Sequence, residues 1–205
     1  MTAHVRPQRA GAPGEAATVL FEREFDRYGV KVLPGEYFVS AQDIVISTVL
    51  GSCVAVCLWE RERRFGGMNH FMLPGDGGDD RTGLAGRYGL FAMEQLINEV
   101  IKRGGRKANL EAKVFGGGAV LPGMTTVNVG ERNVRFVEQF LRTEGIPIAA
   151  RDLLDVHPRR VVFFPQTGRA LCKKLVRAEA SLIAAERQYT EKLAGGRVGG
   201  EVELF

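Results

Sequence analysis

Residues 44–59 read IVISTVLGSCVAVCLW, two apolar and β-branched runs on either side of Gly51-Ser52. Short apolar runs interrupted by a glycine are typical of buried β-strands, so we expect one strand on each side of this break. A charged turn then leads to GGMNHFMLP, residues 66–74, which predicts a third strand. Three strands in direct succession do not follow the regular βαβ alternation of a parallel sheet.

Helical periodicity appears in three later segments, where apolar residues recur every three or four positions. The expected helices span residues 87–103, 131–144 and 178–194. The first of them presents one apolar face, formed by Leu90, Met93, Leu96, Ile97, Val100 and Ile101. Further strands are expected over residues 110–115, 160–164 and 169–176. This mixture predicts an α+β fold whose sheet layers are covered by helices.

Length and composition indicate one compact domain with flexible ends. The chain has 205 residues, of which 45% are hydrophobic, and this is enough to bury a core. Residues 1–20 are small, contain proline and glycine and lack a pattern, so we expect a disordered arm. A single domain over residues 21–195 and a tail over residues 196–205 complete the expected organisation.

Charge and cysteine usage narrow the class of protein. The net charge of +4 comes from scattered basic clusters that are not interleaved with aromatic residues, which argues against nucleic-acid binding. The three cysteines form no CxxC pair and no Cys/His cluster, so neither a zinc site nor a secreted disulfide scaffold is expected. Without a signal peptide or an apolar run of bilayer length, we expect a cytoplasmic protein with no direct membrane insertion.

Cys53 is the cysteine with a chemically distinctive position. It follows Gly51, where the first strand breaks, and such a turn can lift a side chain out of a sheet and aim backbone N–H groups at the same space. Cys57 and Cys172 lie inside strand patterns and are expected to be structural. The competing interpretation of Cys53 is a small residue buried between strands, a common role of free cysteine.

His70 is the histidine best placed to act as a base. It is a polar residue within the apolar strand of residues 66–74, whereas His157 precedes a proline among charged residues and is expected in a surface turn. The turn before this strand is short, so strand pairing could bring His70 near Cys53. A neighbouring imidazole lowers the pKa of a thiol and favours the reactive thiolate. The competing interpretation is a histidine satisfied within the core.

Several motifs together closely resemble the CheD family of chemoreceptor glutamine deamidases. They are LGSCVAV at residues 50–56, GGMNHFMLP at 66–74, KVFGGG at 113–118, GERN at 130–133 and the hairpin of residues 160–175. The resemblance implies a cysteine hydrolase on a β-sandwich-like fold flanked by helices, similar to the catalytic domain of the cytotoxic necrotizing factor toxins. It also implies a Cys–His–hydroxyl triad, with Cys53 as the nucleophile and His70 as the base.

The third member of the implied triad is open between two adjacent residues. The family carries a threonine six residues before the cysteine, and this chain has Ser47 there, followed by Thr48. Adjacent strand residues point to opposite faces, so only one hydroxyl can orient His70. We favour Ser47, because it needs no insertion and shares strand parity with Cys53.

The activity implied by the resemblance is deamidation of glutamine side chains on the cytoplasmic domains of chemoreceptors. His70 would hold Cys53 as a thiolate, and backbone N–H groups near Ser52-Cys53 or in the loop of residues 116–118 would stabilise the oxyanion. No metal or organic cofactor is expected. The alternatives are a transglutaminase-like acyl transfer, in which an amine replaces water, and a regulatory module that binds a CheC-type chemotaxis phosphatase.

Overall fold

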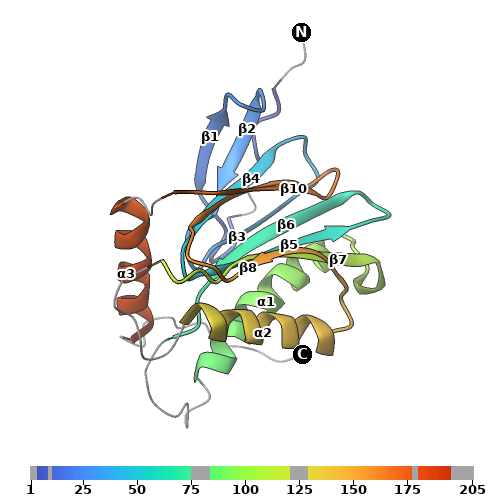
Figure 1. Cartoon of the computed structure of the whole chain (residues 1–205). Coiled ribbons are helices and arrows are strands. Elements are labelled where there is room, and N and C mark those ends of the chain that lie inside the picture. Colours follow the sequence, from blue (N-terminus) through green and yellow to red (C-terminus); the bar gives the residue numbers. More distant parts are fainter. Residues whose placement is uncertain (1–3, 9–10, 75–83, 121–128, 177–179, 195–205) are drawn as a thin grey trace.

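The strands of the protein form two sheets that pack face to face (Figure 1). The computed structural model describes residues 4–8, 11–74, 84–120, 129–176 and 180–194. Within these residues the first sheet has the order β1-β2-β4-β9-β10, and the second has the order β3-β6-β5-β7-β8. The first sheet consists of β1 (Thr18–Glu22), β2 (Arg27–Lys31), β4 (Val45–Leu50), β9 (Arg159–Phe164) and β10 (Arg169–Lys174). The second consists of β3 (Tyr37–Ser40), β5 (Val54–Glu60), β6 (Phe65–Phe71), β7 (Leu110–Gly116) and β8 (Ile148–Leu153).

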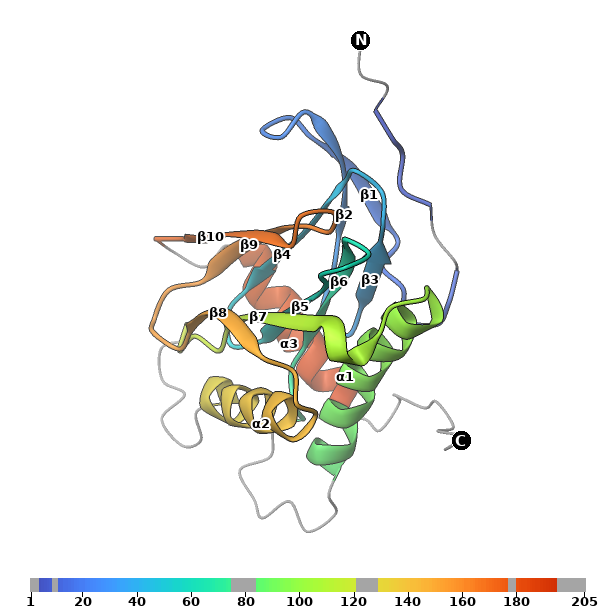
Figure 2. The same cartoon turned by 90° about the vertical axis from the view of Figure 1, so that its right-hand side faces the viewer.

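Helices complete a layered arrangement. Helices α1 (Leu84–Lys102) and α2 (Val129–Thr143) cover the outer face of the second sheet, as Figures 1 and 2 show from two sides. A short 3-10 helix, η1 (Lys107–Asn109), precedes β7. Helix α3 (Ala180–Ala194) lies at the side of the two sheets (Figure 1). None of the helices in the described segments has both the length and the apolar character needed to cross a bilayer.

Strand β5 explains why residues 54–59 lack polar alternation. It is a central strand, paired with β6 on one side and β7 on the other, and both its faces are covered. Val54, Val56 and Leu58 face the layer of helices, whereas Ala55 and Cys57 face the first sheet. Since strand side chains alternate between faces, Cys53 points into the space between the two sheets.

The strongest sequence patterns correspond to observed elements. The α+β class and the sheet layers flanked by helices are confirmed. The strands expected within residues 44–59, 66–74, 110–115, 160–164 and 169–176 are present as β4, β5, β6, β7, β9 and β10. The three helices are also present, with ends that differ by a few residues.

Some expectations need correction. The folded part starts before residue 21, because Ala16 is fully buried and β1 already begins at Thr18. On α1, Leu90 and Ile101 are 41% and 42% exposed, so the buried face is narrower than the sequence pattern indicated. The expected tail, residues 196–205, lies outside the described residues.

Candidate active site

The turn of residues 51–53 carries the chain from the first sheet to the second. Strand β4 ends at Leu50, β5 begins at Val54, and Cys53 is fully buried at the start of β5. The N–H group of Gly117 donates to the carbonyl of Cys53 at 2.7 Å, and that of Gly118 donates to the carbonyl of Gly51 at 2.8 Å. These two N–H groups are therefore committed to the turn, which corrects the idea that they serve as oxyanion donors.

His70 lies on the neighbouring strand and on the same face as Cys53. On β6 it pairs with Ala55 of β5, so it is a diagonal neighbour of Cys53 across the strand pair. Met68 and Met72, two residues to either side, belong to the cluster between the sheets, which fixes the direction of the imidazole. The expected convergence of Cys53 and His70 on one buried space is therefore observed.

Thr48, rather than Ser47, contacts the imidazole. The Thr48 hydroxyl lies 2.8 Å from Nδ1 of His70 and donates to the carbonyl of Val32 at 2.7 Å. Because the hydroxyl donates its single hydrogen to the Val32 carbonyl, it can only accept from His70, so Nδ1 of His70 must carry a proton and donate it to Thr48. Nε2 then keeps its lone pair, and it is buried without a hydrogen-bond partner among the described residues. This is the tautomer that a general base requires.

The preference for Ser47 is wrong for a topological reason. Ser47 donates to the carboxylate of Glu22 at 3.1 Å, on the other face of β4. Ile46 and Leu50, which share parity with Thr48, point into the space between the sheets. The parity argument failed because Ser47 and Cys53 are in different sheets, and strand parity does not continue through the turn of residues 51–53.

A carboxylate from α3 occupies the space in front of this turn. Glu186 is 3% exposed. Its Oε1 accepts the N–H groups of Gly51 at 2.9 Å and Cys53 at 3.2 Å. Its Oε2 accepts the N–H of Ser52 at 3.2 Å and the Ser52 hydroxyl at 2.9 Å. We call these four donors the anion-binding turn. Convergent donors of this kind stabilise negative charge on an oxygen in front of a nucleophile.

The buried pair is neutral in this arrangement. Burial, followed by the charge and hydrogen bond of Glu186, raises the pKa of the Cys53 thiol well above its ordinary value. Burial lowers the pKa of His70 to about 4, although the Glu186 carboxylate opposes this shift. Both shifts favour the neutral thiol and the neutral imidazole over the thiolate expected from the sequence.

Asn133 is a buried polar residue that sequence reasoning missed. It lies on α2, donates to the carbonyl of Ser52 at 2.9 Å and accepts the N–H of Leu73 at 2.9 Å. It thus ties the anion-binding turn to the segment that follows His70. A polar residue beside Val134 on the apolar face of the expected helix could have indicated this buried hydrogen-bonding role.

The remaining candidates lie elsewhere. Cys57 is buried, and burial raises its pKa strongly; Cys172 is half-buried on β10, where burial raises its pKa to about 11. His157 is in the loop between β8 and β9, as expected for a surface turn. In the described segments, no three His, Cys, Asp or Glu side chains gather as a metal site.

Comparisons with known proteins identify the family of the chain. The family model described as CheD chemotactic sensory transduction matches residues 72–174. The probable chemoreceptor glutamine deamidase CheD of Thiobacillus denitrificans is 54% identical over 193 residues, covering 93% of this chain and 96% of the relative. The probable chemoreceptor glutamine deamidase CheD 1 of Albidiferax ferrireducens is 52% identical over 195 residues, covering 94% of this chain and 82% of the relative. With such similarity along nearly its whole length, the chain belongs to the CheD family.

Proposed function

We propose that this protein is a cysteine-dependent deamidase that converts glutamine side chains of chemoreceptor cytoplasmic domains into glutamate. The observation that carries the proposal is the convergence of Cys53, the Thr48-oriented imidazole of His70 and the anion-binding turn on one buried space. The names of the similar CheD proteins supply the substrate class. The receptor domains that would serve as substrates place the reaction in the cytoplasm.

The proposed reaction begins with proton transfer from the thiol of Cys53 to Nε2 of His70. The resulting thiolate attacks the carboxamide carbon, and the carbonyl oxygen becomes an oxyanion held by the N–H groups of the anion-binding turn. The C–N bond then breaks, and His70 gives its proton to the departing ammonia. The product of this first half is a thioester between Cys53 and the substrate side chain.

Water completes the reaction. His70, neutral again, takes a proton from a water molecule that attacks the thioester carbon. The C–S bond breaks, the Cys53 sulfur recovers that proton from His70, and the substrate side chain leaves as a carboxylic acid. Its ionisation protonates the released ammonia, so the sum is glutamine plus water giving glutamate plus ammonium. Neither half consumes a metal, an oxidant or an organic cofactor.

The test is mass spectrometry of purified receptor cytoplasmic domains incubated with the protein. The expected result is conversion of specific glutamines to glutamate, which stops in Cys53→Ala and continues in Cys57→Ala and Cys172→Ala. Ammonia release, measured with and without an added primary amine, separates hydrolysis from acyl transfer. Conversion by Cys53→Ala at the normal rate would refute the assignment of the nucleophile. Binding to a CheC-type phosphatase stays a prediction, to be measured with the purified pair.

A further inference from the structure

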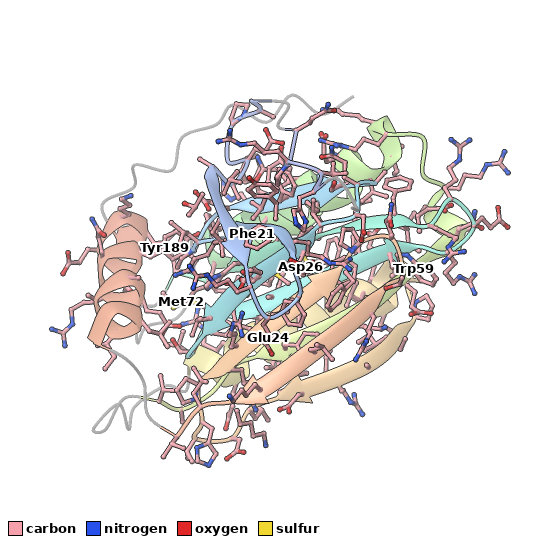
Figure 3. All side chains as sticks on the ribbon, turned by 90° about the horizontal axis from the view of Figure 1, so that it is seen from above. Phe21, Glu24, Asp26, Trp59, Met72 and Tyr189 are labelled. Carbon is pink, nitrogen blue, oxygen red and sulfur yellow. The ribbon has the colours of Figure 1, made fainter. Side chains whose placement is uncertain are left out.

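Helix α3 buries one stripe of side chains, of which Glu186 contacts the anion-binding turn. The stripe consists of Leu182, Glu186, Tyr189 and Leu193, at the spacing of one helical face. Leu182 and Tyr189 are each 8% exposed, whereas Arg187, Gln188 and Glu191 are exposed. Tyr189 shares an apolar cluster with Cys53 and Met72, and Figure 3 shows Tyr189 and Met72 on the side of α3 that faces the strands.

Tyr189 anchors the helix beside the catalytic candidates. A β-carbon on Gly35 would lie 2.7 Å from the Tyr189 ring, so the ring lies directly on the backbone there. Gly35 in turn donates its N–H to the carbonyl of His70 at 2.8 Å. The Tyr189 ring also meets that of Tyr88 on α1 edge-on, with centroids 6.3 Å apart. The helix is thus held over the site from two directions, α1 and the Gly35 segment.

The site is shaped around the carboxyl group of Glu186. A β-carbon on Gly51 would lie 2.8 and 2.9 Å from the two carboxylate oxygens, so the carboxylate packs directly against the Gly51 backbone. All four donors of the anion-binding turn are engaged by this single group. The carboxylate also acts electrostatically on both Cys53 and His70, raising the pKa of each.

Glutamate is the side chain that the proposed reaction produces. We infer that α3 is a built-in product mimic: its Glu186 side chain occupies the subsite for the substrate glutamine, and a substrate helix must displace α3 to react. The inference rests on the proposed function, because Glu186 mimics a product only if the reaction converts glutamine into glutamate. The N–H groups that hold the Glu186 carboxylate are those assigned to the oxyanion of the reaction.

The α3 contacts also define the kind of segment that fits this surface. It is a helix with a glutamine at the position of Glu186, an apolar residue four positions earlier and an aromatic or apolar residue three positions later. These are the positions of Leu182 and Tyr189, both of which are buried on the sheet side of α3. A glutamine in an extended or irregular segment would lack these two contacts.

The first experiment turns α3 into a substrate. In Glu186→Gln the carboxamide is delivered to Cys53 within one chain, so the purified variant is expected to convert the introduced glutamine back to glutamate. Peptide mass spectrometry measures the conversion, which should be absent in Glu186→Gln combined with Cys53→Ala. The matched control is Glu191→Gln, an exposed position on the same helix, where the introduced glutamine should persist.

The second experiment measures access to the thiol. Iodoacetamide should alkylate Cys53 at least roughly tenfold faster in Glu186→Ala and Tyr189→Ala than in the unaltered protein or Glu191→Gln, the change expected for losing one strong contact. Peptide mapping separates Cys53 from the other two cysteines. If the Glu186→Gln variant keeps its glutamine but is alkylated rapidly, the carboxylate charge holds α3 in place, which also supports the inference. A glutamine left unconverted in that variant, with alkylation unchanged in both Glu186→Gln and Glu186→Ala, would overturn it.

The two proposals can fail separately. Receptor deamidation by the unaltered protein, together with unchanged alkylation and no conversion in Glu186→Gln, would retain the proposed function and reject the role of α3. Conversion of the glutamine in Glu186→Gln without receptor deamidation would retain the thiol chemistry and the role of α3, and would reject chemoreceptors as the substrate. A kinetic readout completes the design: Tyr189→Ala should lower KM for receptor domains, because the competitor is weakened.

Discussion

Replacing Thr48 by valine tests the orientation of His70 most directly. Valine keeps the shape of threonine and removes the hydroxyl, so Nδ1–H of His70 and the carbonyl of Val32 both lose their partner. Each buried polar group left unsatisfied costs about 1–3 kcal/mol. About 1.4 kcal/mol corresponds to a factor of ten in rate, so kcat/KM should fall roughly 10- to 100-fold if one such loss is felt in the transition state.

The assay is the rate of receptor glutamine conversion followed by mass spectrometry, with urea unfolding to measure stability. Thr48→Ser keeps the hydroxyl and should stay within a few fold of the unaltered protein. Ser47→Ala is the matched control, because its hydroxyl contacts Glu22 on the other face of β4. A large loss of activity in Ser47→Ala, with normal kinetics in Thr48→Val, would refute the orientation derived from the structure.

Three further outcomes are expected. Burial lowers the pKa of His70 from 6.5 to about 4, so the unfolded state binds more protons than the folded state between these pH values. On acidification from pH 6.5 to about 4, the free energy of unfolding should therefore fall by up to about 1.4 kcal/mol per pH unit. Urea titrations of His70→Gln should show a weaker dependence of that free energy on pH. Asn133→Leu should destabilise the protein by about 2–4 kcal/mol, since the buried N–H of Leu73 and the part-buried carbonyl of Ser52 lose their partner, and a midpoint equal to that of the unaltered protein would contradict this. Leu154→Gly should raise the free energy of unfolding by about 0.5–1 kcal/mol in the same measurement, because Leu154 has a φ of 64° and is 38% exposed; a decrease would show that its side chain matters more than its backbone.

The sequence predicted best the strands that are buried on both faces and the helices that bury one well-defined apolar face. Central strand β5 is a continuous apolar run, and α2 has a sharply apolar stripe, so both stand out. The strands that were missed, β1, β2, β3 and β8, are short, and three of them carry polar or charged residues on exposed positions. Three of the four, β1, β3 and β8, lie at sheet edges, and short strands of this kind depend on pairing with a neighbour, which no local pattern encodes.

The candidate nucleophile and base could be chosen from local sequence, whereas the residues that contact them could not. Cys53 is marked by the break at Gly51, and His70 is marked by its apolar strand. The partner of His70 depends on which sheet each strand joins. The role of Glu186 depends on where α3 packs. The same helix also carries Glu191, which looks equivalent in sequence but is exposed. Long-range packing decides both, and it is absent from a window of neighbouring residues.

Gly51 lies at the turn that the sequence predicts, but the physical reason for a glycine there differs from the expected one. Its backbone freedom was the argument for a turn that exposes Cys53, yet its φ lies outside the left-handed region, where glycine is favoured. What the structure shows is close packing, because a side-chain atom of Val120 and both oxygens of Glu186 lie within 2.9 Å of the place where a β-carbon would be. In this structure a carboxyl group fills the space beside Gly51 and the candidate nucleophile Cys53. In the two proposals, the same space serves the substrate glutamine and the Glu186 carboxylate that competes with it.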